Sequence, residues 1–554
     1  MSEEKKSGSG NIILQASILA AAGIITRIIG LLYRSPLSGI IQDLGLGYYQ
    51  SAYNYYTIIL LISSYSIPSA ISKVIAQKLA VHEYKNAHRI FKGALCYVLV
   101  VGIIASTFLY FAAGLFVEEA AIPVLRTFAP TIFFYGILGV LRGYFQAHKS
   151  MVQTSLSQIF EQVANAVVSV GAAYLLIKLS MGTMEVPEDT AGQVTRAVRG
   201  AMGSALGTGT GVIVAMLLML FFYLRSRRSI KEHIASDTST ELDSAGTIIK
   251  TITMIVTPFI LSTAMYNLSS VVNNKLYTSF YPAFRGLDTV VTSSRYGIFS
   301  GKALIISNIP IAFASAMASA MIPSIAQLVA KKEIAEAREK VQLSVKTTML
   351  ISIPCAVGLF VLAGPITLLL FPNAAANLEL SRYTLMALSV SVIFFALSTL
   401  NSSILQGLGK IYSPIINSAI ALVIQSVTAV ALLFFTDLDV YSIAISSTLY
   451  SLIAALLNQR STRRAIDYKQ EIVHTFILPF VASLIMGGAA YGVYRLVYFI
   501  HPSMRIAVIP AIIVAVPVYF VALLLVKGVN ENELRSFPKG RLLVRVAKKL
   551  RLLR

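Results

Sequence analysis

Two arginines mark the first long hydrophobic segment of the chain, residues 11–33. Arg27 lies within this segment, and Arg34 directly follows it, ahead of a predicted turn at Ser35, Pro36 and Gly39. A guanidinium inside a bilayer costs at least about 2.5–3.5 kcal/mol on insertion scales, so Arg27 needs a wet cavity, an acidic partner or a ligand. Seven residues are two helical turns, which places both arginines on one helix face, about 10 Å apart along the axis. Such a pair suits an anion such as a diphosphate, although snorkelling or a structural ion pair would also accommodate Arg27.

Glu161 is the one acidic residue well inside a predicted span, residues 154–179. A carboxyl group at that depth is a candidate for coupling transport to a proton or another cation. The alternative is a structural ion pair with a base such as Arg142. No His, Cys, Asp or Glu cluster has the spacing of a metal site, and no glycine-rich phosphate loop follows a strand. Without a cofactor or ATP, the energy would come from the membrane potential or an ion gradient, where one charge crossing 100 mV is worth about 2.3 kcal/mol.

The composition predicts an all-α integral membrane protein. Of the 554 residues 56% are hydrophobic and only 13% are charged, against about 25% charged in a soluble protein. Apolar runs of about 20 residues or more recur along the chain, which is the length a helix needs to cross a bilayer. Hydropathy predicts about fourteen transmembrane helices. They cover residues 11–33, 48–68, 91–116, 122–145, 154–179, 200–224, 248–271, 297–322, 343–371, 380–406, 412–435, 440–458, 472–500 and 504–526.

The positive charge follows the membrane pattern. The formal net charge is +21, and most Lys and Arg residues fall in alternate short connections and in the two tails. The positive-inside rule therefore places both termini in the cytoplasm. No RNA- or DNA-binding module is present to use this charge, so we expect no nucleic acid partner.

Two pairs of sequence segments predict an internal repeat. The segment SIPSAISKVIAQKLA (66–80) is similar to MIPSIAQLVAKKE (321–333), and LRGYFQAHKSMVQTS (141–155) is similar to SSILQGLGKIYSPIINS (402–418). In both pairs the partners lie six predicted helices apart, which indicates two parallel six-helix repeats with substrate held between them near mid-membrane. The predicted organisation is an N-lobe (1–235), a C-lobe (236–465), a terminal helix pair (466–527) and a basic cytoplasmic tail (528–554).

The tail and a tyrosine cluster suggest membrane contacts. The end of the chain, KGRLLVRVAKKLRLLR, alternates apolar and basic residues at helical spacing. This pattern predicts either an amphipathic helix on anionic inner-leaflet lipids or a solubilising tail. The chain has no Trp, and tyrosines gather at the start of the second span. These are expected to be interfacial anchors or, alternatively, to stack on a ligand. They are Tyr48, Tyr49, Tyr53, Tyr55 and Tyr56.

Several of these segments together resemble one family. TRIIGLLYR (26–34), the tyrosine-rich second span, IPSAISKVIA and LRGYFQAHKS are similar to the MurJ/SpoVB-type flippases of the MOP (MATE-like) exporter superfamily, over nearly the whole chain. The resemblance implies a bacterial plasma-membrane flippase, without enzymatic activity, that moves undecaprenyl-linked cell-wall precursor, above all lipid II, to the outer leaflet by alternating access. It also implies cell-wall synthesis proteins as possible partners.

The resemblance assigns roles to three basic residues. The first helix of the family carries a pair of arginines in a cationic cavity that binds the diphosphate-sugar head group, and Arg27 and Arg34 match that pair. Lys302, in the eighth predicted span, is the candidate for a cationic contact from the other lobe. This chain departs from the pattern at Ser35, where many members carry an acidic residue, and it lacks an evident further basic residue near the second span. These departures favour the SpoVB-like Gram-positive branch.

Three other functions remain open on the sequence. The first is a flippase for another lipid-linked polysaccharide unit. The second is a cation-coupled multidrug exporter of the same superfamily, which would need an acidic cavity. The third is a membrane-embedded glycosyl- or phosphotransferase, which would need paired carboxylates at a span end. The weak candidates for that role are Asp437 with Asp439 and Glu188 with Asp189.

Overall fold

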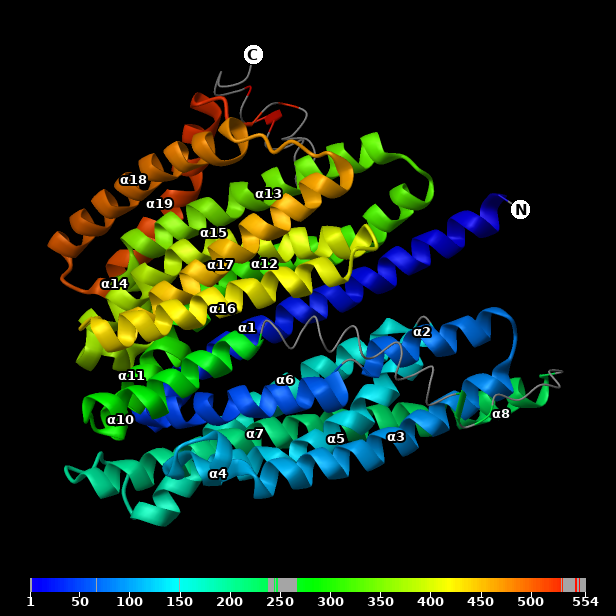
Figure 1. Cartoon of the computed structure of the whole chain (residues 1–554), viewed down its shortest axis with the longest axis horizontal. Helices are drawn as coiled ribbons and strands as arrows, with labels where there is room; N and C mark the ends of the chain where they lie inside the picture. Colours follow the sequence, from blue (N-terminus) through cyan, green and yellow to red (C-terminus); the bar gives the residue numbers. More distant parts are fainter. Residues whose placement is uncertain are drawn as a thin grey trace. The chain divides into compact units, whose positions relative to one another are not determined.

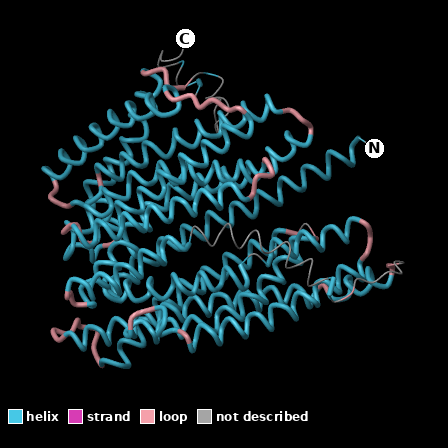
Figure 2. Tube along the Cα trace, viewed as in Figure 1, coloured by secondary structure: helices cyan, strands magenta, loops and turns pink. Residues whose placement is uncertain are grey.

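The computed structural model is helical throughout the part of the chain that it describes (Figure 2). The described residues are 2–65, 67–148, 150–237 and 267–529, together with the isolated positions 244, 246, 247, 531, 544, 545 and 548. The chain divides into two compact units, residues 1–297 (unit 1) and 298–554 (unit 2). The lobe boundaries predicted at 235 and 465 stay predictions.

Unit 1 consists of helices that run back and forth (Figure 1). They are α1 (Ser2–Leu60), α2 (Ile67–Ala80), α3 (Tyr84–Phe111), α4 (Ala113–Phe116), α5 (Ile122–Ala147), α6 (Met151–Met181), α7 (Thr190–Arg225), α8 (Arg227–Ala235), α10 (Tyr281–Arg285) and α11 (Thr289–Ile298), whose last residue belongs to unit 2. Shorter segments are the π-helical η1 (Leu61–Tyr65) and η3 (Leu276–Phe280) and the 3₁₀ turn η2 (Glu119–Ala121). A helical stretch, 267–275, precedes η3.

Unit 2 has the same all-helical character. Its helices are α12 (Leu304–Ala330), α13 (Ile334–Val361), α14 (Ala363–Leu370), α15 (Leu378–Gly407), α16 (Tyr412–Phe435), α17 (Val440–Ile466), α18 (Leu478–Ile500) and α19 (Met504–Leu525). Shorter segments are the π-helical η4 (Phe299–Ala303) and η6 (Val473–Ile477) and the 3₁₀ segment η5 (Pro372–Asn377). Helices α18 and α19 pack on each other and on α13 and α14, which fits the predicted terminal helix pair.

Twelve helices among the described residues are long and apolar enough to cross a membrane. The first of them, Ala22–Ser64, overlaps two of the predicted spans, 11–33 and 48–68, and its backbone breaks between them at Gln42. The predicted span 248–271 lies almost wholly outside the described residues. The predicted all-α transmembrane fold is therefore confirmed.

The same helix pairs pack together in each unit. In unit 1, α5 lies against α2, α3 and α7, and α6 lies against α7; in unit 2, α15 lies against α12, α13 and α17, and α16 lies against α17. The central helices α5 and α15 each carry a glycine where the backbone of a neighbouring helix, α2 or α12, comes close. A Cβ at Gly143 would lie 2.8 Å from the carbonyl oxygen of Pro68, and one at Gly407 would lie 2.9 Å from that of Ile322. These contacts join the two segment pairs that indicated the repeat.

The turns after α2 and α12 also match. His82 and Lys332 both adopt left-handed backbone angles, with φ of 59° and 63°. The next residue in each turn, Glu83 or Glu333, precedes a new helix with nearly the same conformation. Each glutamate accepts a backbone hydrogen bond from the residue four positions on, Ala87 or Ala337. The repeat that the sequence predicts thus extends to individual backbone conformations.

Candidate functional site

Helix α1 doubles back on itself and so brings its two halves together. Gln42 leaves the helical region with φ 58° and ψ −176°. Arg34 precedes this break, yet it lies within electrostatic reach of Tyr49 and Tyr53, which follow it. In a straight helix the fifteen residues from 34 to 49 would span about 22 Å. The first two predicted spans are therefore two antiparallel halves of α1.

The position of this turn differs from the sequence expectation. Ser35, Pro36 and Gly39 read as a turn after the first span, but all three are helical. Local side-chain hydrogen bonds accompany the continued helix, from the Ser38 hydroxyl to the Ser35 carbonyl and from the Gln42 amide to the Gly39 carbonyl. Proline inside a helix removes one hydrogen bond without always ending the helix. The break therefore falls at Gln42, one turn later than expected.

The two arginines of α1 are accessible to different degrees. The Arg27 side chain is exposed and that of Arg34 is partly exposed. Between them, Gly30 packs towards α6, since a Cβ there would lie 3.1 Å from the Gln162 Nε2. Gly23, one heptad earlier, has no such neighbour within 4 Å. The arginine face therefore flanks the side of α1 that packs on α6.

Arg34 belongs to a polar chain that runs from α1 into α6. It hydrogen-bonds the hydroxyl of Tyr33. The Asn165 Nδ2 lies 3.5 Å from the same Tyr33 hydroxyl, and the Ser169 hydroxyl donates to the Asn165 Oδ1 at 2.9 Å. The recorded partners of Arg34 are thus phenols, which leave its charge available to an anion.

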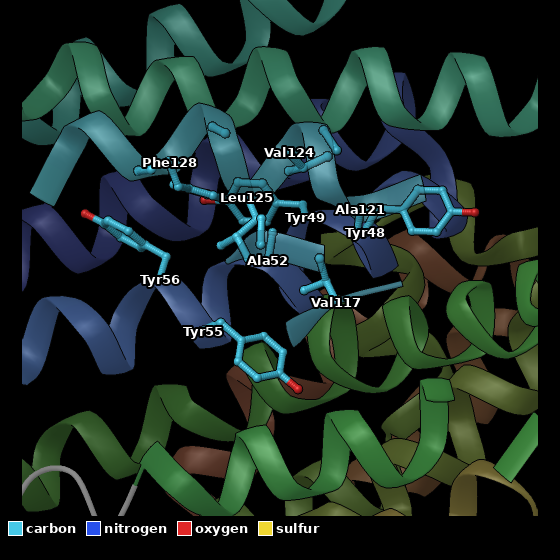
Figure 3. Packing of buried hydrophobic residues seen from close by; sticks show 14 of the residues in the cluster. Tyr48, Tyr49, Ala52, Tyr55, Tyr56, Val117, Ala121, Val124, Leu125 and Phe128 are labelled. Atoms are coloured by element: carbon cyan, nitrogen blue, oxygen red, sulfur yellow. The ribbon is translucent and has the colours of Figure 1, made fainter. Parts of the chain in front are cut away.

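The tyrosines of the second span are core residues. Tyr48, Tyr49, Tyr55 and Tyr56 are at most 7% exposed and belong to one cluster with Phe128 of α5 (Figure 3). Tyr56 stacks on Phe128 with ring centroids 4.8 Å apart. Their expected role as interfacial anchors is therefore wrong, because all four are buried: Tyr49 and Tyr56 pack on Phe128, and Tyr55 packs on Phe116 of α4. Tyr53 alone is partly exposed.

Glu161 forms an ion pair with Arg142. The Arg142 Nη2 donates to the Glu161 Oε2 at 2.6 Å, and the Arg142 Nε donates to the Ser157 hydroxyl at 2.9 Å. The arginine is buried on α5 and the glutamate is partly exposed on α6. Tyr56 of α1 is within electrostatic reach of the glutamate. The alternative that the sequence offered for Glu161 is thus present, and its coupling role stays a prediction.

Lys302 lies in unit 2, within the π-helical segment η4. Its side chain is 0% exposed, and η4 packs against α15. A π-helical turn widens the backbone locally and often accompanies function in membrane helices. The proposed contact of Lys302 with substrate stays a prediction.

Sequence reasoning missed the polar chain around Arg34. Tyr33 lies more than 130 residues before Asn165 and Ser169 in the sequence, so no local pattern connects it to them. A search for polar residues at helical spacing on α6 would have found Asn165 and Ser169, which are four apart. Among the described residues, no group of three His, Cys, Asp or Glu side chains could hold a metal ion. Most of the predicted basic tail lies outside the described residues.

Comparison with known proteins decides the family. A family model described as "Lipid II flippase MurJ" matches residues 89–508, about three quarters of the chain. The chain belongs to the MurJ lipid II flippase family. Membership of this family makes the chain a multi-pass membrane transporter for lipid-linked cell-wall precursors rather than an enzyme. A solved structure of a multidrug resistance MATE family transporter of the MOP superfamily has a similar fold, with a TM-score of 0.59 at 17% identity, over 82% of this chain and 98% of that one.

Individual relatives agree with the family assignment. The chain is 25% identical to the lipid II flippase MurJ of Bacillus subtilis (strain 168), over 87% of this chain and 88% of that protein. It is 23% identical to stage V sporulation protein B of the same organism, over 95% and 98%. A solved structure of lipid II flippase MurJ in an inward closed conformation matches with a TM-score of 0.64 at 15% identity, over 92% of this chain and 98% of that one. The fold is therefore the MurJ fold.

Proposed function

We propose that this MurJ-family protein moves undecaprenyl-linked peptidoglycan precursor, lipid II, from the inner to the outer leaflet of a bacterial plasma membrane by alternating access. The observation that carries the proposal is the pair Arg27 and Arg34 on one helix face of α1. Lipid II presents a diphosphate between a long apolar chain and a sugar head group. Guanidinium groups bind such phosphates with paired, charge-assisted hydrogen bonds.

The surroundings of Arg34 fit an anionic ligand. Arg34 is held by the Tyr33 hydroxyl and lies near Tyr49 and Tyr53, so its position is fixed without neutralising its charge. Tyr33 is itself positioned by Asn165 on α6. A guanidinium held in advance loses less side-chain entropy on binding than a free one. Lys302 is proposed as a further cation for the head group, and the membrane potential or an ion gradient as the energy source.

Arg27→Ala and Arg34→Ala test the proposal. Each variant is expressed in cells depleted of their own flippase, and lipid II on the outer leaflet is labelled with an impermeant reagent. We expect each alanine variant to lower translocation at least about tenfold, because one charge-assisted phosphate contact is worth about 1.5–3 kcal/mol. Lys retains the charge but not the paired bonds, so Arg34→Lys should keep part of the activity.

The matched control is Arg126→Ala. Arg126 is also an exposed arginine of unit 1, but it bonds the Tyr110 carbonyl and lies over that ring. Its removal should leave translocation unchanged. Full translocation by Arg27→Ala and Arg34→Ala at normal membrane levels would refute the proposed site. If the wild-type protein does not move lipid II, but cell growth still depends on both arginines, the substrate is another undecaprenyl-linked unit.

A further inference from the structure

Glu118 is a half-buried carboxylate that lies in a connection between membrane helices. It directly precedes η2, between α4 and α5. Three hydroxyl groups lie within hydrogen-bond reach of it, those of Ser51 at 3.4 Å, Ser293 at 3.1 Å and Thr278. The Ser51 and Thr278 hydroxyls also bond to Asn274, at 3.1 and 3.0 Å, so of the three only Ser293 does not share its proton. These donors belong to the second half of α1, to α11 and to η3. One carboxylate therefore joins four segments of unit 1 that are far apart in sequence.

The segments that Glu118 joins are in direct backbone contact. A Cβ at Gly47 of α1 would lie 2.0 Å from the Ser293 carbonyl oxygen, and one at Gly297 of α11 would lie 2.0 Å from that of Asp43. No side chain fits in either place. The absence of a side chain at these two positions lets the backbones of α1 and α11 touch. Movement of α11 away from α1 would break both of these contacts.

Two further hydrogen bonds continue the same seam. The Ser51 hydroxyl donates to the Asn274 Oδ1 at 3.1 Å, and the Asn54 Nδ2 donates to the Tyr296 hydroxyl at 2.9 Å. Ser51 thus lies between Glu118 and Asn274. The seam between α1 and α11 thus combines glycine contacts and neutral hydrogen bonds with two carboxyl groups, those of Glu118 and of the buried Asp43 on α1.

Within the described part of the chain, no Lys, Arg or His side chain forms an ion pair with Glu118. Tyr48 and Tyr55 of α1 and Tyr296 of α11 are within electrostatic reach. Asp288, which precedes α11, also acts on Tyr48. The nearby Lys275 Nζ donates to the carbonyls of Leu115 and Phe116 instead, at 3.5 and 3.2 Å.

This setting favours the protonated form of Glu118. Burial raises the pKa of the Glu118 carboxyl, and the three hydroxyl donors oppose that rise only in part. A carboxyl whose pKa is raised in the closed seam binds its proton more tightly there than when it is hydrated. Lower pH therefore stabilises the closed seam, and rising pH through the raised pKa loosens it.

We propose that Glu118 is a proton-controlled latch that holds α11 against α1. With the carboxyl protonated the seam stays closed; once ionised, the carboxylate gains hydration when the helices part. Glu118 lies in a connection that the charge pattern places outside the membrane, so its proton would come from the outer side. The idea rests on the proposed function only in treating movement of α11 as a step of transport.

Cysteine labelling of α11 tests the latch without any substrate. Thr292 is fully buried in α11 and Thr289 is exposed one turn earlier. Thr292→Cys and its control Thr289→Cys are made in a full-length chain carrying Cys96→Ser and Cys355→Ser. The ratio of their labelling rates with an impermeant maleimide is measured in proteoliposomes from about pH 5.5 to 8, with Glu118 and with Glu118→Gln.

The glutamine variant mimics the protonated carboxyl. With Glu118 in place we expect the labelling ratio to rise about tenfold more between the pH limits than with Glu118→Gln, where the ratio stays low. The glutamine background also corrects for the different ionisation of the two introduced thiols. Equal pH profiles in the two backgrounds would overturn the proposal.

Ser293→Ala supplies a second, independent variant. It keeps the carboxyl but removes one donor that lowers the pKa of Glu118, so the midpoint of the labelling profile should move to higher pH. A merely structural role would change the labelling rates without moving the midpoint, and an unmoved midpoint counts against the latch. Because the proteoliposomes contain no lipid-linked precursor, failure here leaves the arginine test of substrate binding intact, and the reverse also holds.

Discussion

Unit 1 and unit 2 share their helix packing but not the chemistry of their interiors. Each has a central helix with a glycine in close contact with another helix: α5 packs this glycine on α2, and α15 packs it on α12. In unit 1 the residue before that glycine is Arg142, which pairs with Glu161; in unit 2 it is the neutral Gln406. The repeat therefore preserves the helix packing, while the position that carries Arg142 in unit 1 is uncharged in unit 2.

The polar network of unit 2 is built from neutral groups. Asn458 of α17 donates to Ser402 of α15 at 2.9 Å and accepts from the Asn417 Nδ2 of α16, also at 2.9 Å. Amide networks of this kind join helices without the desolvation cost of ions. The Arg142–Glu161 ion pair is therefore not required by the helix packing that the two units share, and this points to a function for it in unit 1.

Removing Arg142 should show this difference most strongly. Arg142→Ala leaves the Glu161 carboxylate without its ion-pair partner. We therefore expect the free energy of unfolding to fall by about 3 kcal/mol. Gln406→Ala, at the matching place in unit 2, should cost less than about 1 kcal/mol. Thermal unfolding of the purified variants in detergent gives both values. Similar losses at the two positions would mean that the charge of Arg142 has no special role in unit 1.

Glycine substitutions should instead affect the two units alike. Gly143→Ala and Gly407→Ala both push a Cβ to within 3 Å of a backbone carbonyl oxygen, and overpacking of this kind costs about 1–3 kcal/mol. Gly171→Ala in α6 is the control, because its Cβ would meet nothing within 4 Å, and it should be neutral or slightly stabilising. A large difference between Gly143→Ala and Gly407→Ala, measured by the same thermal unfolding, would break the structural match.

The smallest effect is expected at the matched turns. Glu83 accepts from Lys78 and Asn86, both at 2.8 Å, and these bonds lower the pKa of its carboxyl. Its contribution to stability is therefore present above the ordinary carboxyl pKa and is lost as pH falls through the lowered value. Lys78→Leu, which copies Leu328 of the α12 turn, should remove most of this pH dependence. The unfolding temperatures of the wild type and of Lys78→Leu are measured as the pH is lowered. An equal fall in the two proteins would contradict this prediction.

Sequence alone predicts the fold to a large extent, because hydropathy and the repeat depend on composition and spacing. The span list, the helix pair α18–α19 and the segments around Gly143 and Gly407 all follow from those signals. The break in α1 was misplaced, since Pro36 and Gly39 are typical turn residues but the helix passes through them to Gln42. Local propensity does not reveal which of several breaks tertiary packing selects.

The candidate site was harder to predict than the fold. Arg27, Arg34 and Glu161 stand out because charge is rare in a span, whereas their partners are ordinary polar residues of distant helices. The tyrosines of the second span were misjudged for a related reason. An amphipathic ring suits a bilayer interface and a helix–helix core equally well, and only the packing against Phe128 distinguishes the two.

The left-handed conformation of Gln42 has a mechanical consequence. This one residue connects the helix that bears the guanidinium pair to the helix that bears the tyrosine cluster and the seam with α11. A change in its two backbone torsions would change the angle between the helices without breaking hydrogen bonds inside either one. Gln42 thereby connects the half of α1 proposed to bind phosphate to the half that contacts α11 near Glu118, where protonation is proposed to act.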